Sequence, residues 1–374
     1  MKSHNKFGYE GKTMSKFQSF LEHVKREFGK GRVDIRMLLE KEFDIDISAS
    51  YLGLNLKNPI IVAPGPLSQR ISQIKRAAKA GYGGMVLKSV VGEDKDGNAS
   101  MKVLRKRSTF ARWVYDEEGN PIFHWNGGLD LRSLKDYLAF ARKAFKIGKQ
   151  NEFPLIASFL CHLPKNVDEE WRVEEWEYTT KKLVEAASVM YGDSPVILEV
   201  DFCPFLKREK LAVDRATVLR WYREAPMLIK ETSSNVQVVP KLLNLDFGLD
   251  FQVEMAIAAK DGGADGVVIA NRFFRKYVVK ETGEEYFTAH GGRELRILNQ
   301  RQIREVKKSI DIPISATGGT YSGKHVAEYL KIGAQNVQVL TYVMKNGFEK
   351  AFYNLMFNPE DGFLTLILKE RFGR

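Results

Sequence analysis

The sequence predicts an α/β protein whose main part is a (β/α)8 TIM barrel. The 374 residues are enough to bury a large core, and 44% of them are hydrophobic. From residue 51 onward, short runs rich in Val, Ile and Leu alternate with longer helix-like stretches, which implies a parallel sheet. Eight such runs occur, the number that closes a barrel. A doubly wound open sheet is the alternative, but it rarely contains eight consecutive units of this kind.

The eight expected strands are nearly continuous in aliphatic residues, which is typical of parallel strands covered on both faces. They are expected at residues 59–65, 83–91, 155–161, 196–202, 236–243, 266–271, 313–319 and 336–342. The amphipathic stretches between them predict outer helices, among them residues 71–80, 173–188, 251–261 and 324–332.

Residues 1–50 precede this pattern and are expected to form an N-terminal helical extension. Apolar side chains recur there at helical spacing in a charged background, at Phe17, Phe20, Leu21, Val24 and Phe28. A second helix is expected around residues 37–43. We interpret the extension as helices packed under one end of the barrel; a membrane-surface or partner-docking element is the alternative.

One interval inside the barrel, at about residues 92–150, is too long for an ordinary βα connection. It is expected to hold an insertion over the carboxyl-terminal mouth of the barrel, where functional loops lie. The chain is therefore divided into the extension, residues 1–50, and a barrel domain, residues 51–374, that carries this insertion.

The composition excludes several classes of protein. Two cysteines form at most one bridge and cannot supply an iron–sulfur cluster or a structural zinc site, so no metal site is predicted. No signal-peptide pattern and no apolar run of about 18–20 residues is seen, which predicts a cytoplasmic protein without a membrane span. The net charge of +11 fits a lysine-rich solvated surface better than an anionic partner.

Polar residues close most of the expected strands, where a barrel of this type carries its reactive side chains. They are Lys88, Ser89, Cys203, Lys241, Asn271, Gly318, Gly319 and Thr341. Two lysines in apolar strands are costly to bury unless an anionic group meets them. The stretch TGGTYSG, followed by a helical segment, suits phosphate binding through backbone N–H groups. It is not a Walker A loop, because His325 replaces the Ser or Thr that binds magnesium.

These residues resemble the flavin mononucleotide (FMN) barrels of the dihydroorotate dehydrogenase family, from about Leu52 to Phe348. The family's motifs are echoed in order by LGLNLKNPIIVAPGP, GGMVLKSV, LEVDFCPF, PKLL, IAN, HGGRE, IPISATGGTYSGKH and GAQNVQVLTYVMKNG. The resemblance implies an FMN-binding role for Ala63, Gly65, Lys88, Ser89, Lys241, Asn271, Gly291, Gly292, Gly318, Gly319 and Thr341. Lys241 would also act in catalysis, because a cation near the N1–O2 edge stabilises the reduced, anionic flavin.

The resemblance implies that Cys203 is the catalytic base. Oxidation of a C–C bond beside a carbonyl removes a proton from one carbon and passes a hydride from its neighbour to flavin N5. A thiolate is a competent base when its pKa lies near the operating pH. A buried structural cysteine is the alternative interpretation. Cys161, which is followed by His162, also ends a strand and is a second candidate for the base.

The sequence departs from the family pattern around the substrate. Apolar residues, Val200, Phe202 and Phe205, stand where asparagines and a serine usually surround the cysteine, and Leu340 replaces a glycine before Thr341. The inserted loop reads HWNGGLD, so the expected substrate-binding asparagine is displaced to Asn126 or replaced by Trp125. Asn271 and Arg272 complete the predicted substrate contacts, with the guanidinium suited to clamp a carboxylate.

The predicted function is therefore that of an FMN-dependent oxidoreductase of pyrimidine biosynthesis, acting on dihydroorotate or a related cyclic dihydropyrimidine. The electron acceptor is left open between fumarate, NAD, quinone or another. The prediction allows a homodimer and a separate electron-acceptor subunit. A non-catalytic barrel relative is one alternative, which the lost asparagines favour.

A second alternative is an enzyme that resembles the tRNA dihydrouridine synthases. The segment from Met101 to Trp113 holds five basic residues and no acidic one, with interleaved aromatic rings that suit an RNA strand. Only about 26 residues follow Phe348, however, too few for the RNA-binding tail of those enzymes. A nucleic-acid partner is therefore not favoured.

Overall fold

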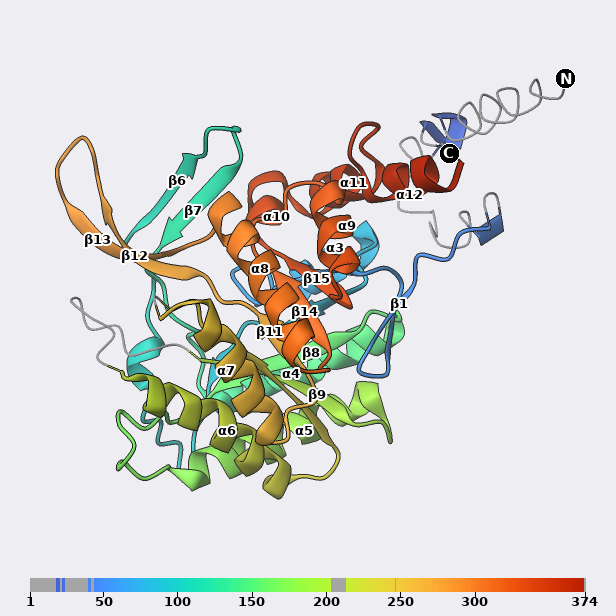
Figure 1. Ribbon diagram of the computed structural model, residues 1–374. Helices are drawn as coiled ribbons and strands as arrows, with labels where there is room; N and C mark the ends of the chain where they lie inside the picture. The colour runs from blue at the N-terminus through green and yellow to red at the C-terminus, as the bar shows by residue number, and fades with distance from the viewer. Residues whose placement is uncertain are drawn as a thin grey trace, which may run out of the picture.

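A closed barrel of eight parallel strands forms the centre of the protein, as the computed structural model shows for residues 18–20, 22–23, 40–41, 44–202, 213–245 and 247–372 (Figure 1). The barrel strands are β3 (Ile60–Val62), β4 (Gly84–Val86), β8 (Leu155–Leu160), β9 (Val196–Asp201), β10 (Val236–Lys241), β11 (Val267–Ile269), β14 (Ile314–Thr317) and β15 (Asn336–Val339). Each lies inside one of the eight runs predicted from the sequence. Pairing of β4 with both β3 and β8 closes the ring.

Helices follow the strands and surround the barrel. They are α3 (Ile71–Ala80), α4 (Leu134–Gln150), α5 (Val173–Tyr191), α6 (Arg215–Thr232), α7 (Leu249–Asp261), α8 (Arg293–Ser309) and α9 (Gly323–Lys331). Three more helices end the described chain: α10 (Thr341–Asn346), α11 (Phe348–Phe357) and α12 (Phe363–Phe372). The helices packed against the strands cover them so completely that the barrel strands are almost wholly buried, which explains their unbroken aliphatic runs.

The hairpin β1 (Ala49–Tyr51) and β2 (Leu54–Leu56) precedes the first barrel strand. Its two turn residues, Leu52 and Gly53, have φ angles of 49° and 82°, which matches the turn type favoured in two-residue hairpins. Of the predicted N-terminal helices, most residues lie outside the described part of the chain. Phe20 is described and is 4% exposed.

The predicted insertion supplies β5 (Val90–Val91), a short 3-10 helix, η1 (Lys102–Leu104), and the hairpin β6 (Ala111–Tyr115) and β7 (Pro121–Trp125). A second insertion, which sequence reasoning missed, follows β11 and forms the hairpin β12 (Phe273–Val278) and β13 (Glu285–His290). The two hairpins join in one antiparallel sheet of order β12-β13-β7-β6 that projects from the barrel (Figure 1).

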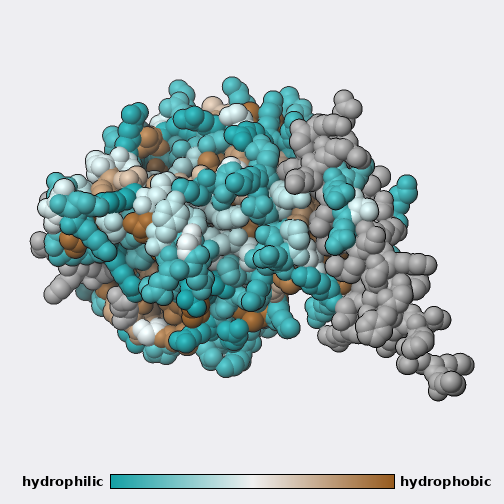
Figure 2. All heavy atoms as spheres, turned by 90° about the horizontal axis from the view of Figure 1, so that it is seen from above, coloured by the Kyte–Doolittle hydropathy of each residue, from teal (hydrophilic) through white to brown (hydrophobic). Residues whose placement is uncertain are grey.

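The face of the molecule drawn in Figure 2 is mainly hydrophilic, with apolar side chains scattered over it. The exposed large apolar residues, such as Val103, Leu131, Met227 and Ile297, come from different elements. Within the described residues, no helix is both long and apolar enough to cross a membrane.

Candidate active site

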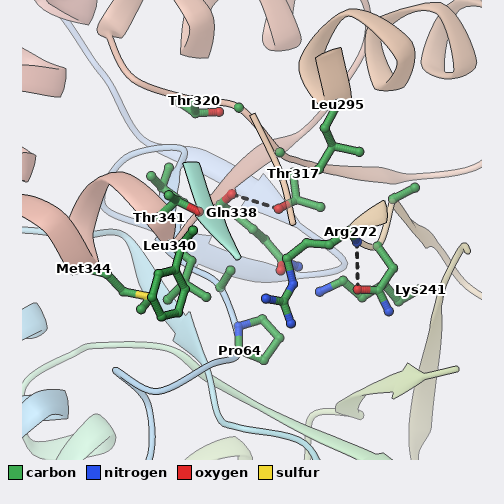
Figure 3. Close-up of a pocket in the computed structure, with 18 of the residues that line it drawn as sticks. Pro64, Lys241, Arg272, Leu295, Thr317, Thr320, Gln338, Leu340, Thr341 and Met344 are labelled. Atoms are coloured by element: carbon green, nitrogen blue, oxygen red, sulfur yellow. Dashed lines mark hydrogen bonds between the residues drawn. The ribbon is translucent and has the colours of Figure 1, made fainter. Parts of the chain in front are cut away.

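A pocket opens at the carboxyl-terminal ends of the barrel strands, where the sequence predicted the site. Its walls come from the ends of β9, β10, β14 and β15, the segments after β3, β4 and β11, the strand β7 and the start of α8 (Figure 3). The lining contains these predicted site residues: Ala63, Lys88, Lys241, Asn271, Arg272, Gly291, Gly318, Gly319 and Thr341. The topology therefore brings together residues separated by up to 278 positions in the chain.

Four predicted residues lie in the structure but do not line this pocket: Gly65, Ser89, Gly292 and Asn126. The first three adjoin it. Leu340, which lines the pocket, packs against Gly65, Ser89 binds the lining residue Asp201, and the carbonyl of Gly292 packs against Gly319. The side chain of Asn126 is instead occupied within its own loop.

Asn126 holds residues 108–110 in place. Its Oδ1 accepts hydrogen bonds from the Ser108 hydroxyl and from the backbone N–H groups of Thr109 and Phe110, each at 3.0 Å. Its Nδ2 donates to the Thr109 hydroxyl at 2.9 Å. The neighbouring Trp125 lines the pocket, so the structure favours the second of the two possibilities drawn from the loop sequence.

Cys203, the predicted base, lies outside the described residues, which resume at residue 213. The second candidate, Cys161, is buried and donates from Sγ to the carbonyl of Glu175 at 3.3 Å. Burial raises the pKa of the Cys161 thiol well above its ordinary value. Cys161 is also absent from the pocket lining, so it packs as a structural thiol rather than a base.

The floor of the pocket holds a buried ion pair. Lys241 Nζ lies 3.4 Å from Glu199 Oε1, and Gln338 Nε2 donates to Glu199 Oε2 at 2.8 Å. Desolvation raises the pKa of Glu199, although the Lys241 charge opposes this shift. Gln338 Oε1 is buried and finds no partner within the described chain, and Gln338 lines the pocket. The floor therefore offers a fixed cation and an acceptor.

Asp201 is a site residue that sequence reasoning missed. It ends β9 and lines the pocket, with Asn271 Nδ2 donating to Oδ1 and the Ser89 hydroxyl donating to Oδ2, both at 3.0 Å. Alternation along a strand puts Asp201 on the same face as Glu199, inside the barrel. The signal was present in the sequence, because two acidic residues spaced by two interrupt an otherwise apolar strand.

Two of the apolar replacements noted near Cys203, Val200 and Phe202, alternate with Glu199 and Asp201 and lie on the other face of the chain at β9, whereas Phe205 lies outside the described residues. Val200 and Phe202 are wholly buried, and the Phe202 ring packs 4.5 Å from the ring of Tyr222 in α6. They therefore contribute to the packing between strand and helix. Their apolar character does not remove polar groups from the pocket, because Glu199 and Asp201 stand on the inward face of β9.

Trp125 forms an aromatic wall next to two cations. Lys88 Nζ lies 5.1 Å and Arg272 Cζ 5.0 Å from an indole ring centroid, within the range of cation–π attraction. Lys88 is only 5% exposed, and Arg272 extends across the pocket (Figure 3). This wall can stack on a planar ligand and meet its negative or carbonyl oxygen atoms.

A second part of the pocket, called the anion end below, is built from glycine loops and suits an anion. Gly318 and Gly319 have φ angles of 100° and 60°, which glycine adopts at little cost. A Cβ at Gly319 would collide with the carbonyl of Gly292, so the loops approach each other closely. Thr320 is 4% exposed, and its Oγ1 has no hydrogen-bond partner within the described chain. A buried hydroxyl of this kind calls for a ligand atom.

Leu340 narrows the pocket beside these loops. Its side chain packs so closely on Gly65 that a Cβ at position 65 would overlap it. The sequence departure at this position therefore has a steric consequence, since Leu340 occupies space that a glycine leaves open.

Known proteins similar to this chain belong to the family that the sequence motifs resemble. The model of the dihydroorotate dehydrogenase family matches residues 223–353. Dihydroorotate dehydrogenase B (NAD(+)), catalytic subunit, from Pyrococcus abyssi is 23% identical over 307 residues, covering 81% of this chain and 89% of the relative. The chain is therefore similar to dihydroorotate dehydrogenases at low sequence identity. The NAD-dependent dihydropyrimidine dehydrogenase subunit PreA of Escherichia coli K12 is also 23% identical, over 81% of this chain and 70% of its own.

A third relative, dihydroorotate dehydrogenase A (fumarate) from Lactiplantibacillus plantarum, is 25% identical over 78% of this chain and 86% of its own. The part matched by the dihydroorotate dehydrogenase model contains Lys241, Asn271 and the glycine loops. Lys88, Trp125 and Asp201 lie before it. The family match is therefore centred on the anion end of the pocket.

In the basic segment from Met101 to Trp113, Arg105 and Arg112 pair with acidic side chains, whereas Lys102, Lys106 and Arg107 are exposed. Arg105 pairs with Glu93 and is largely buried, and Arg112 pairs with Glu281. The Phe110 ring stacks on Tyr286, with centroids 4.0 Å apart. Within the described residues, no group of His, Cys, Asp and Glu side chains suits a metal ion.

Proposed function

We propose that the protein is an FMN-dependent oxidoreductase that oxidises a C–C bond of dihydroorotate or of a related cyclic dihydropyrimidine. One observation carries the proposal: Lys88, Lys241 and Asn271, from three strand ends, line the same pocket as the glycine loops. The names of the similar proteins support the reaction class, since they are dehydrogenases of dihydroorotate or dihydropyrimidine.

The residues at the anion end fit the phosphate of FMN. Gly291, Gly318 and Gly319 line the pocket with backbone rather than side chains, and the Thr320 hydroxyl, which has no partner among the described residues, would donate to a phosphate oxygen. Thr341 begins α10 and lines the same end. The proposal extends the predicted phosphate-binding set by Thr320, which the sequence motif contained but did not single out.

Lys241 would stabilise negative charge on the ring system of the cofactor. When bound, FMN would supply the acceptor for two electrons. Glu199 holds the Lys241 ammonium on the floor of the pocket, so the cation needs no reorganisation as charge develops. The role of Lys88, on the Trp125 side of the pocket, would be to hold the ring of cofactor or substrate.

Cys203 would act as the base of the reaction. The Cys203 thiolate would take the proton from one substrate carbon, and FMN, when bound, would supply the acceptor for the hydride of the neighbouring carbon. A carbon–carbon double bond forms between the two carbons. The residue follows Phe202 directly after β9, the strand that brings Asp201 to the pocket.

Reconstitution tests the proposal directly. The purified protein, incubated with FMN and freed of excess cofactor, is expected to show a bound-flavin spectrum. Anaerobic titration with dihydroorotate, or in parallel with dihydrouracil, is expected to bleach that spectrum as the flavin is reduced. A protein that takes up no FMN, or a bound flavin that neither compound bleaches, would contradict the proposal.

The electron acceptor of the next half-reaction is proposed to be a separate subunit. Two of the similar proteins are named as subunits, one of them as a catalytic subunit. The two cysteines of this chain cannot hold a cluster that would pass electrons on. Reoxidation of the reduced protein by NAD alone, fumarate alone or a quinone would each argue against such a subunit.

A further inference from the structure

Asp201 places a carboxylate in the pocket, and the proposed roles of the cofactor-binding residues do not account for it. It is a carboxylate in a lining that otherwise presents cations at Lys88, Lys241 and Arg272. A carboxylate accepts hydrogen bonds and donates none when ionised. Its presence therefore restricts what a ligand can place against the end of β9.

The protein holds this carboxylate with donors only. Asn271 Nδ2 donates to Oδ1, and the Ser89 hydroxyl donates to Oδ2. Ser89 lies 2.8 Å from the hydroxyl of Ser158, which can donate to Ser89 in turn. Among the residues that the structure describes, each Asp201 oxygen thus has one donor, which leaves a second lone pair for a ligand. A ligand N–H satisfies that lone pair, whereas a ligand carbonyl or carboxylate is repelled by it.

The wall formed by Trp125, Lys88 and Arg272 offers the complementary chemistry. Its indole can stack on a planar ring, and its cations attract carbonyl oxygen atoms. A cyclic amide carries an N–H and a C=O on adjacent ring atoms. Such a ring can direct its N–H to Asp201 and its carbonyl to the cations.

We propose that Asp201 determines substrate specificity by accepting a hydrogen bond from the ring N–H of a cyclic amide. This inference rests on the proposed function and names the substrate edge that this site recognises. Substrates would be cyclic amides or imides with a free N–H, and analogues alkylated on nitrogen would be excluded. Rejection of an analogue that lacks a donor follows because it leaves the Asp201 carboxylate desolvated and unpaired.

Binding of two probes to the FMN-reconstituted protein, measured by calorimetry, tests the role of Asp201. Uracil has ring N–H groups, and 1,3-dimethyluracil has none. The unsubstituted protein is expected to bind uracil at least about tenfold more tightly. Equal affinities for the two compounds would overturn the inference, and this comparison needs no variant to fold.

Asp201→Asn is the matched substitution. Its side chain has nearly the same shape, its oxygen can still accept from Asn271, and its amide can donate to the Ser89 hydroxyl. The variant is expected to bind uracil about tenfold more weakly, with its preference over 1,3-dimethyluracil reduced to within about threefold. The bulk of the methyl groups is the same in both proteins, so it cannot produce this change. A preference that persists undiminished in the variant would overturn the inference.

Glu118→Gln is the control for the change in charge. Glu118 lies in the β6–β7 turn, is exposed and pairs with Arg293 at 3.2 Å, away from the pocket lining. Its substitution is expected to leave both affinities unchanged. If the protein takes up no FMN, the proposed function fails. If FMN binds and dihydropyrimidine reduces it while N-methylation has no effect, only the inference about Asp201 fails.

Discussion

The two ends of the pocket are built in different ways. The anion end uses glycine backbone in loops after β13 and β14, and the rest of the lining uses side chains from β7, β9 and the segment after β11. The first kind of site depends on which residues can adopt positive φ angles and permit close approach. The second depends on which side chains distant elements bring together. The family match covers the first and omits Trp125 and Asp201 of the second.

The largest effect is expected from Gly319→Ala, which breaks the anion end. A Cβ there would collide with the Gly292 carbonyl, and the φ angle of 60° costs a non-glycine residue about 1–2 kcal/mol. FMN binding, measured by quenching of flavin fluorescence, is expected to weaken by more than about a hundredfold. Gly283→Ala is the control, because Gly283 has a φ of 71° but open space around it. If FMN binding weakened equally in both variants, the positive φ angle would explain the loss and the collision with the Gly292 carbonyl would not.

A second prediction concerns the substrate side. Cys203→Ala is expected to leave FMN binding intact and to slow flavin reduction by about a hundredfold or more, because the base is lost. Stopped-flow absorbance under anaerobic conditions measures the rate. Cys161→Ala is expected to leave the rate unchanged, since the Cys161 thiol is buried away from the pocket. A normal rate in the first variant would show that another group takes the proton.

A third prediction concerns the buried pair beneath both ends. The pKa of Glu199 is raised in the folded protein, so folding favours its protonated form. The Glu199 contribution to stability is therefore greatest below its unfolded pKa of about 4.3, and it is lost as the pH rises through the folded value. Glu199→Gln is expected to remove this pH-dependent loss of stability, because glutamine does not ionise. Urea unfolding between about pH 4 and pH 8 is expected to show a smaller decline with pH in the variant than in the parent, and equal slopes would contradict the assignment.

The smallest effect is expected from Leu340→Ala. Removing the side chain that packs against Gly65 widens the pocket beside the glycine loops. FMN binding is expected to become about threefold tighter, as relief of crowding outweighs the apolar contact that is lost. Fluorescence titration measures the change. Weaker binding would show instead that Leu340 contacts the cofactor favourably.

Local patterns were sufficient to predict the barrel and the anion end. A buried parallel strand must be apolar on both faces, so each of the eight strands was visible in a run of a few residues. The loop at Gly318 and Gly319 was visible because only certain residues tolerate its backbone angles. The hairpin formed by β12 and β13 was missed, because its strands are half-exposed and contain neither a continuous aliphatic run nor a regular apolar–polar alternation, reading FFRKYV and EYFTAH.

The sequence by itself determined the fold, and it predicted a site at the mouth of the barrel with loops suited to an anion, because backbone requirements act over a few neighbouring residues. Only the tertiary structure decided which side chains face a ligand. It placed Trp125 rather than Asn126 in the pocket, enclosed Cys161, and set Asp201 between Ser89 and Asn271. These outcomes depend on strand pairing and on contacts across more than a hundred residues, which no local pattern records.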